Sequence, residues 1–359
     1  MNELNKQHID ACRFCWMCRH ICPIGNATGL ERNTSRARAL GLSLVNRNVY
    51  GIEEVVDNLY ECAGCGACTE DCVTGWDPVM FTKAARLDAA LEGKLPEYIN
   101  VLVDNCLNTG NAYGKTDFCD CLKAEIKNHA DNTDTLLFLG VDARYMAPTS
   151  AVNAIKAAEK TGVKFTVLAD EPTSGAQLEY LISAADETKA QMVECAKVLN
   201  NYKTVIAYDP QDALVLKRKY AELGIELTCD VVTFTSFLAD ALKNGSLKLN
   251  KTDKAAAYQD PFQLSRDLLE TEPAREVVKA ACELTEMLCN GKATIWAGNI
   301  LMASWIPEVM EAVAQNRITN AKNMGATAIV TASVSEYVSL KKVEQNDVEI
   351  ISIEELVIA

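Results

Sequence analysis

Two stretches of sequence decide how the amino-terminal part of the chain folds: Cys12-Arg13-Phe14-Cys15-Trp16-Met17-Cys18-Arg19-His20-Ile21-Cys22-Pro23 and Cys62-Ala63-Gly64-Cys65-Gly66-Ala67-Cys68-Thr69-Glu70-Asp71-Cys72. Both follow the pattern C-x-x-C-x-x-C-x-x-x-C, which lets four thiolates bind one inorganic centre. Two successive x-x spacings followed by x-x-x are typical of cubane 4Fe–4S clusters. Because the pattern occurs twice, we expect two clusters close enough to exchange electrons. The runs therefore predict electron transfer without naming a substrate.

The same run occurs in two-cluster bacterial ferredoxins, where the fourth cysteine of each run binds the other cluster. By that resemblance, one cluster is held by Cys12, Cys15, Cys18 and Cys72, and the other by Cys62, Cys65, Cys68 and Cys22. Zinc is the alternative occupant, but zinc sites usually pair two C-x-x-C units. Val73 stands where a proline is expected after Cys72, a departure that removes no ligand. No catalytic residue is predicted, and no cofactor-binding residue beyond these ligands.

Composition and charge narrow the class of protein. The 359 residues suffice for two or three domains, and the formal net charge of −14 argues against nucleic acid as the main partner. Residues 1–10 are polar, with no apolar signal segment, and no apolar stretch approaches the roughly 20 residues that cross a bilayer. We therefore expect a cytoplasmic protein whose thiols stay reduced, without a disulfide framework.

The cysteines outside the two runs are less informative. Four isolated ones are expected to be small core residues: Cys195, Cys229, Cys282 and Cys289. Cys106, Cys119 and Cys121 are three thiols without a fourth, and whether they bind a metal stays open. A basic patch formed by Arg32, Arg36 and Arg38, with Arg47 nearby, has three possible roles. It could offset cluster charge, receive an acidic partner, or be a solvated helix face.

Hydrophobic patterns divide the chain into four parts. Residues 1–100 are expected to form an α-helical ferredoxin domain, with helices at 31–44, 51–60 and 77–93, followed by a connector at 101–134. The connector contains the turn-like Asn111-Ala112-Tyr113-Gly114.

From residue 135 onward, short apolar runs alternate with helical stretches, which predicts βαβ units with parallel sheets. Strands are expected at 136–139, 165–168, 205–208, 255–258, 326–331 and 348–351, and helices at 276–284 and 308–324. The order of elements in 135–250 recurs in 251–359, so we expect two copies of one α/β half.

The order of parts resembles the iron–sulfur subunits of the glycolate oxidase and heterodisulfide reductase families, in which a helical dicluster ferredoxin precedes two cysteine-rich CCG domains. Asn111-Ala112-Tyr113-Gly114 is similar to the family's Asn-Pro-Tyr-Gly, and Leu139-Gly140-Val141 to its strand ending in Gly-Cys. The run from Tyr258 to Arg266 is similar to its His-Asp-Pro-Cys-x-Leu-x-Arg, and Pro273-Ala274-Arg275 to its Pro-Arg. The resemblance covers nearly the whole chain.

The thiols that define the CCG motifs are absent. The positions concerned hold Thr173-Ser174-Gly175, Asp209-Pro210-Gln211-Asp212, Phe262, Ala297-Gly298-Asn299 and Ala332-Ser333-Val334-Ser335. In the family these thiolates hold a second metal centre, and hydroxyls and carboxylates are poor ligands for it. The resemblance thus implies two degenerate CCG halves. Their loops become either a docking face for a flavoprotein or a structural remnant.

Together these patterns predict an electron-transfer subunit of an oxidoreductase complex, in which two 4Fe–4S clusters relay single electrons. The resemblance implies an FAD-containing dehydrogenase or electron-transfer flavoprotein as partner, hence a hetero-oligomer with another redox carrier. The subunit itself need not be an enzyme. One alternative is a catalytic subunit like heterodisulfide reductase, and another is a non-catalytic iron–sulfur sensor or scaffold.

Overall fold

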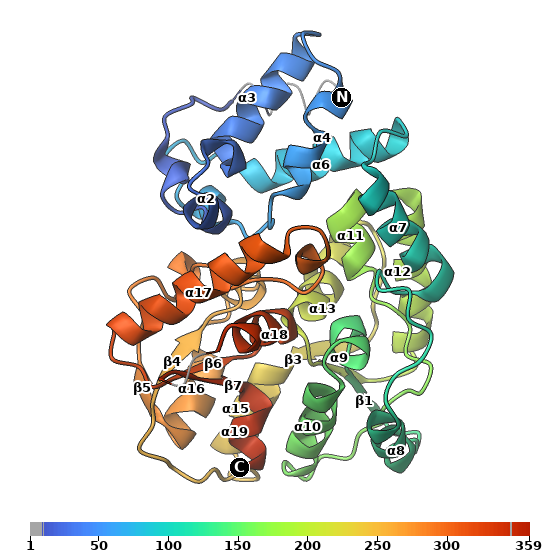
Figure 1. The fold of residues 1–359 in the computed structure, drawn as a ribbon. Helices are drawn as coiled ribbons and strands as arrows, with labels where there is room; N and C mark the ends of the chain where they lie inside the picture. Colours follow the sequence, from blue (N-terminus) through green and yellow to red (C-terminus); the bar gives the residue numbers. More distant parts are fainter. Residues whose placement is uncertain (1–8, 10, 345–346) are drawn as a thin grey trace.

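The computed structural model of the chain describes residues 9, 11–344 and 347–359, so most of the polar segment before Ala11 lies outside the described residues. The amino-terminal part is a set of short helices (Figure 1). They are η1 (Met17–Arg19), α2 (Pro23–Thr28), η2 (Glu31–Asn33), α3 (Ser35–Asn46), η3 (Ile52–Glu54), α4 (Val56–Tyr60), α5 (Ala67–Glu70) and α6 (Pro78–Leu91). The all-helical character agrees with the prediction.

Prolines and capping side chains start two of these helices, and one of the caps is a cysteine of the first run. Pro23 and Pro78 occupy the first turns of α2 and α6, where a missing N–H costs no hydrogen bond. The Cys22 thiol caps α2 by accepting the Gly25 N–H, and the Asp77 carboxylate caps α6. The predicted helix at 77–93 is confirmed. The one expected at 51–60 is wrong in its first half, where the 3-10 turn η3 precedes α4.

The connector is also helical. It contains α7 (Glu97–Thr109), which spans the expected boundary after residue 100, and α8 (Asp120–Asn128). Between them, Asn111–Gly114 forms the predicted turn, with Gly114 in the left-handed region at φ +64°.

The next part contains a three-stranded parallel sheet in the order β1 (Thr135–Phe138), β2 (Thr204–Ala207), β3 (Asp230–Thr233). Its helices are α9 (Val141–Tyr145), α10 (Pro148–Glu159), α11 (Ala176–Ile182), α12 (Asp186–Leu199), α13 (Pro210–Leu214), the π-helix η4 (Val215–Lys219), α14 (Tyr220–Glu222) and α15 (Phe234–Lys243). The expected strand at 165–168 is reduced to one parallel bridge, in which Thr166 pairs with Leu136. Strand β3 was not predicted.

The last part contains a four-stranded parallel sheet in the order β5 (Glu283–Thr285), β4 (Ala255–Gln259), β6 (Ala328–Thr331), β7 (Glu349–Ser352). Its helices are the π-helix η5 (Gln263–Asp267), α16 (Glu272–Ala281), η6 (Gly291–Ala293), η7 (Met302–Ser304), α17 (Pro307–Asn323), α18 (Val334–Lys342) and α19 (Ile353–Ile358). The predicted helix at 308–324 is confirmed within one residue at each end. The one at 276–284 is wrong at its end, because Glu283–Thr285 pairs with β4 as an edge strand.

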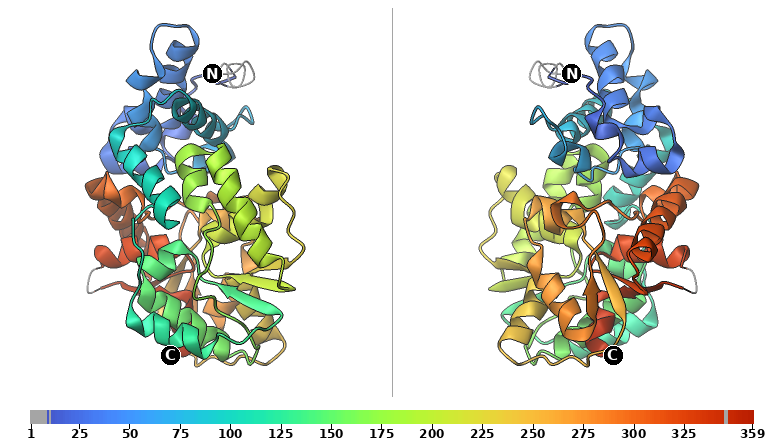
Figure 2. Two further views of the ribbon diagram at one scale, coloured as in Figure 1. Left: turned by 90° about the vertical axis from the view of Figure 1, so that its right-hand side faces the viewer. Right: turned by 90° about the vertical axis from the view of Figure 1, so that its left-hand side faces the viewer.

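The two sheets share one strand order. In the first, the segment around Thr166 borders β1, which is followed by β2 and β3; in the second, β5 borders β4, which is followed by β6 and β7. The expected repetition of element order is therefore present in the topology. One core joins the sheets: side chains of β1, β2, β4 and β6 pack with residues of α10, α15, α16 and α19. In Figure 1 the helical amino-terminal part lies over one end of these sheets, and Figure 2 shows the same arrangement from both sides.

The helical part is joined to the rest by a second core. Leu42, Leu59 and Phe81 of the helical part are buried together with Leu178 and Leu181 of α11. Helix α17 packs against α2 from the other side. The position of the cysteine runs relative to the sheets is therefore set by packed apolar side chains. Among the described residues, no helix is long and apolar enough to cross a membrane.

Candidate iron–sulfur centres and an adjoining cavity

Thiols of both runs line one small hollow at the outer end of the helical part. Its lining includes Cys12, Cys15 and Cys18 of the first run together with Cys68 and Cys72 of the second. Cys15 is exposed. Burial raises the pKa of the Cys12 thiol, and a hydrogen bond from the Phe14 N–H opposes this rise. The neighbouring thiols of Cys18, Cys15 and Cys72 raise the pKa further. Cys72 therefore lies among the thiols of the other run, as the crossed arrangement requires.

The second group of thiols is buried more deeply. Cys22, from the first run, lies with Cys62, Cys65 and Cys68, and burial raises the pKa of Cys68 well above its usual value, with added effects of the other three thiols. Burial likewise raises the pKa of Cys65 to about 11. Backbone N–H groups approach the sulfurs, because Gly25 donates to Cys22 Sγ and Gly64 donates to Cys62 Sγ, both at 3.4 Å.

Gly64 and Gly66 make the second loop possible. Both have positive φ, +66° and +72°, a conformation that a residue with a Cβ rarely adopts. The loop can therefore turn its N–H groups toward the thiols.

Arg38 supplies a buried positive charge beside the second group. Only 3% of its surface is exposed, and its pKa is raised because the charges of Cys62, Cys22 and Cys68 outweigh the effect of burial. Its Nη2 donates to the Asn33 carbonyl at 2.9 Å, whereas Nε and Nη1 have no hydrogen-bond partner among the described residues. A buried guanidinium with two free donors is costly unless an anion lies beside it.

This arrangement fits iron–sulfur clusters. Each group offers four thiolates, N–H groups directed at sulfur, and in the second group a buried cation that an anionic cluster would neutralise. Among the described residues, no three Cys, His, Asp or Glu side chains converge closely enough to hold a single metal ion. A cubane binds its cysteines through four separate irons, so its ligands need not converge on one point.

The basic patch is divided by the fold. Arg38 is buried against the second group, which corrects the interpretation of the patch as one solvated helix face. Arg36 pairs with Glu31 and stacks on Trp16 at 3.9 Å, while exposed Arg32 pairs with Glu61 at 2.7 Å. Helix α3 places Arg38 inward because Ala39 and Leu42, on the same side of the helix, are buried in the core.

Side chains of the α/β part hold the second loop directly. Tyr180 of α11 donates its hydroxyl to the Cys62 carbonyl at 2.8 Å, and Arg266 of η5 donates to the Cys65 carbonyl at 2.8 Å. Arg86 of α6 is also buried, and it donates to the Cys62 carbonyl at 2.8 Å and to the Tyr180 carbonyl at 2.7 Å. The second group is thus fixed to the sheets by hydrogen bonds as well as by packing. No sequence pattern pointed to Arg86 or Tyr180, whereas Arg266 ends a run that the family resemblance had singled out.

A cavity of about 760 Å³ lies between this loop and the carboxyl ends of the strands. Its lining includes Gly64 and Gly66 of the second run and residues of four loops that stand where CCG thiols were expected: Thr173, Ser174, Asp209, Gln211, Asp212, Phe262 and Asn299. The fifth such loop reaches the same place, because Ser335 donates to Asp142 at 2.6 Å and the Val334 N–H to Asp209 at 3.2 Å. Open α/β sheets bind ligands at this edge.

Several carboxyl groups line the cavity, among them those of Asp142, Asp209 and Asp212. Burial, with the charge of Asp142, raises the pKa of Asp209 to about 7. Burial and the charge of Asp209 raise the pKa of Asp212 well above its usual value, although Asp212 accepts a hydrogen bond from Ser174. None of the described lining residues is a cysteine. The wall thus offers hydroxyl, amide and carboxyl groups, which are poor ligands for iron–sulfur clusters.

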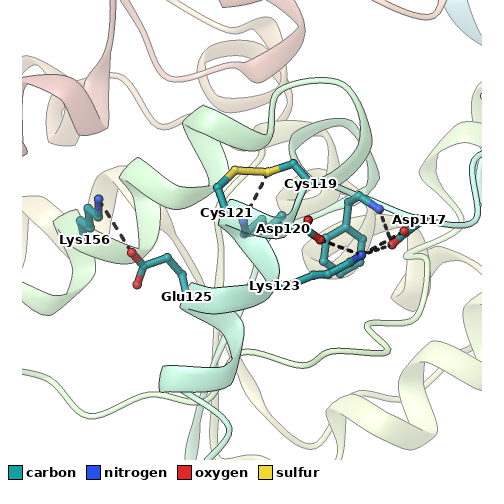
Figure 3. Close-up of a disulfide and its surroundings, with 9 residues drawn as sticks. Asp117, Cys119, Asp120, Cys121, Lys123, Glu125 and Lys156 are labelled. Carbon is teal, nitrogen blue, oxygen red and sulfur yellow. Dashed lines mark hydrogen bonds and ion pairs between the residues drawn. A yellow bond between two sulfur atoms is a disulfide. The ribbon is translucent and has the colours of Figure 1, made fainter.

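The remaining cysteines do not form a third thiol cluster. Cys119 and Cys121 are joined in a disulfide at the start of α8 (Figure 3). Cys106 lies on α7, where it is 2% exposed, contacts Gln177, and has a pKa raised by burial to about 12. Two of these three thiols are bonded to each other, so the three do not form the metal site whose presence the sequence left open. This single bond is not the disulfide framework that the sequence argued against. Cys195, Cys229 and Cys282 are buried as predicted, and Cys289 is partly buried.

Comparison with known proteins agrees with this geometry. Residues 8–76 match the 4Fe-4S dicluster domain family, so this part of the chain is a 4Fe–4S protein domain. The chain is 25% identical to one of the subunits of dihydromethanophenazine:CoB–CoM heterodisulfide reductase from Methanosarcina acetivorans, over 92% of this chain and 88% of that protein. It is 22% identical to one of the subunits of fumarate reductase (CoM/CoB) from Methanothermobacter marburgensis, over 97% of this chain and 71% of that protein.

A third relative is named for a membrane location. It is a probable membrane-anchored ferredoxin of Chromohalobacter salexigens, 26% identical over 75% of this chain and 41% of that protein. Taken together, the matches relate the chain to iron–sulfur subunits of the heterodisulfide reductase type, and they support iron–sulfur electron transfer and oxidoreduction.

Proposed function

We propose that the chain is an electron-transfer subunit that carries two 4Fe–4S clusters and works in a complex with a flavin-dependent dehydrogenase. The ligands of the first cluster are Cys12, Cys15, Cys18 and Cys72, and those of the second are Cys62, Cys65, Cys68 and Cys22. When bound, each cluster accepts or gives up one electron at a time. The observation that carries the proposal is the exchange of the fourth cysteines: Cys72 lies with the first run and Cys22 with the second.

The chain's own residues differ between the two ends of this relay. The first group lies at the surface, where Cys15 is exposed and Trp76, stacked on Phe81 at 4.8 Å, closes the inner side of the hollow. The second group is held by Arg38, Arg86 and Tyr180 and borders the cavity through Gly64. The first thiol group is therefore the end of the relay that is open to solvent, and the second thiol group is the end that faces the sheets.

The flavin partner is inferred from the resemblance and from the chemistry of the relay. A flavin takes up a hydride as two electrons, and two one-electron clusters suit the division of that pair. The loops around Asp209 and Phe262 lie at the cavity beside the second group, so we assign the grip on the flavoprotein to this side of the α/β part. A hetero-oligomer follows from this assignment, and we propose that it is cytoplasmic.

One observation favours a second candidate, a catalytic subunit similar to heterodisulfide reductase. The cavity is large enough for a small organic substrate and adjoins the second thiol group. Its lining lacks the thiolates that would hold a metal centre there, so the relay is preferred. Turnover of a disulfide by the isolated chain, supplied with an artificial electron donor, would favour the catalytic candidate. A sensor or scaffold would keep its clusters but pass no electrons to any carrier.

The ligand assignment can be tested with pairs of cysteine substitutions. If the fourth cysteines cross, Cys15→Ala and Cys72→Ala damage the same cluster, and the double variant keeps about four of eight irons. Cys15→Ala combined with Cys22→Ala damages both clusters and leaves almost none. Uncrossed ligation reverses the two results. Cys195→Ala, at a buried thiol outside both groups, is the matched control and keeps all eight.

The flavoprotein partner needs a separate experiment. Purification of the chain from its native cell, without oxygen, should bring down a flavin-containing protein in a fixed ratio. The attached protein should reduce the clusters when its own substrate is added. A complex without flavin would contradict the proposed partner while leaving the cluster assignment in place.

A further inference from the structure

The segment that carries the first cysteine run, residues 11–50, has a charge opposite to that of the whole chain. Residues 11–50 contain six arginines and one acidic residue, Glu31, and they contain no lysine. The full chain, in contrast, has 35 basic and 49 acidic residues. A local positive region can attract an acidic partner even when the whole protein is acidic. The reason is that salt screens charges more than about 10 Å apart, so the charges nearest the partner decide the interaction.

The fold concentrates part of this charge at the exposed thiol. Trp16 lies between two arginines, with the guanidinium of Arg36 3.9 Å and that of Arg19 5.4 Å from its ring. Arg13 lines the same hollow as Cys15. Arg36 is neutralised by Glu31, whereas no ion pair of Arg13 or Arg19 is present among the described residues. Two cations therefore remain available beside the thiol group.

The same surface exposes large apolar side chains. Trp16 and Met17 are each 44% exposed, and Val73, between two residues that line the hollow, is 68% exposed. Trp, Met and Arg are enriched at protein–protein interfaces, and cations around an apolar centre give both contact area and orientation. We call the surface formed by Arg13, Cys15, Trp16, Met17, Arg19 and Val73 the Arg–Trp face.

We propose that the Arg–Trp face is the docking surface for a small acidic electron-carrier protein of the ferredoxin type. The inference rests on the proposed function and adds the place and charge of the second carrier. Docking there would let one electron pass between the carrier and the centre held by the first thiol group. The carrier and this centre exchange one electron, so that one is oxidised and the other is reduced. No bond is formed or broken, and no proton is transferred. A second copy of this acidic chain and a nucleic acid are the competing occupants.

The charge complementarity can be measured with two carriers of opposite charge. The probes are an acidic plant-type [2Fe–2S] ferredoxin and a basic c-type cytochrome, each mixed with the iron-loaded full chain. We expect the ferredoxin to bind in calorimetry and to exchange electrons in stopped flow, with a rate that falls at least tenfold between low and high salt. The cytochrome should show no such attraction to this face.

Charge reversal then locates the surface. Arg13→Glu combined with Arg19→Glu should weaken ferredoxin binding and slow association at least tenfold at low salt, without loss of iron. The milder pair Arg13→Gln and Arg19→Gln should give an intermediate loss if the reversed variant folds poorly. Lys248→Glu combined with Lys251→Glu changes the charge equally at two exposed residues of the link before β4, and should have little effect.

The outcomes separate this inference from the proposed function. Clusters that exchange electrons with neither carrier would overturn the relay itself. Exchange with the ferredoxin that is unchanged by the Arg13 and Arg19 substitutions would overturn the docking surface alone. Self-association or nucleic-acid binding that disappears on charge reversal, in ultracentrifugation or a gel-shift assay, would assign the face to another occupant and would also overturn the inference.

Discussion

Replacing Arg38 by methionine would test whether the second thiol group holds an anionic cluster. Arg38 is 3% exposed, and two of its donor nitrogens have no partner among the described residues. Its pKa is raised by interaction with Cys62, Cys22 and Cys68, and then with Glu61, against the effect of burial. If a cluster occupies the group, the guanidinium stabilises its more negative, reduced state. Arg38→Met should therefore lower the midpoint potential of this cluster.

The size of the shift follows from Coulomb's law. For an assumed separation of about 7 Å between the guanidinium and the cluster charge, and an effective dielectric constant of about 20, the interaction is about 2 kcal/mol. For a one-electron couple about 1.4 kcal/mol corresponds to about 59 mV, so the expected shift is about −90 mV. Methionine is close to the arginine stem in shape, which limits the loss of packing.

Potentiometric titration followed by electron paramagnetic resonance would measure the shift in one of the two clusters. Arg47→Met is the matched control, because Arg47 is exposed beyond the carboxyl end of the same helix, α3. Its potentials should equal those of the unmodified protein. If Arg38→Met leaves both the iron content and both potentials unchanged, the assignment of a cluster beside Arg38 is refuted.

Three further predictions concern the surroundings of the centres. Tyr180→Phe removes the hydrogen bond to the Cys62 carbonyl, so it should cost about 1 kcal/mol and speed the removal of iron from the second group, but not the first, by a chelator. Burial raises the pKa of Glu336 to about 8, so its neutral form is favoured in the fold. The free energy of unfolding that it contributes is therefore greatest below its ordinary pKa and is lost as the pH rises through about 8. Between pH 6 and 8, the free energy of unfolding measured by urea denaturation should fall less steeply with pH in Glu336→Gln than in the unmodified protein. The difference in slope is at most about 1.4 kcal/mol per pH unit. Cys121→Ser opens the Cys119–Cys121 disulfide and should leave the iron content unchanged, whereas a loss of iron on elemental analysis would show that these thiols serve a cluster.

Strong local patterns carried most of what the sequence could predict of the fold. The helices over Pro78–Leu91 and Pro307–Asn323 have a proline in the first turn and long periodic runs, and both were found. Buried strands such as Val205 and Ile206 in β2 are marked by short apolar runs between polar residues. Where pairing with a distant strand decides the conformation, the sequence was insufficient. Glu283–Thr285 becomes an edge strand only because β4 lies beside it.

The candidate site shows the same division. The spacing of the cysteines indicated three ligands of each thiol group, since residues that are close in sequence stay close in space. The exchange of the fourth cysteines came from the resemblance to two-cluster ferredoxins. The burial of Arg38 could not be predicted, because it depends on which face of α3 packs inward. The convergence of Thr173, Asp209 and Phe262 on one cavity depends on the repeated sheet topology, which appears only after folding. That these loops are degenerate CCG motifs stays a prediction.

Quantitative iron and sulfide analysis of the chain, purified without oxygen, tests the central claim most directly. Two cubanes bound by the eight thiols of the paired runs predict about eight irons and eight sulfides per chain, with a resonance of two interacting one-electron centres after reduction. A content of about four irons per chain would mean that only one cluster is bound, which would contradict the relay. Zinc in place of iron would contradict the proposal entirely.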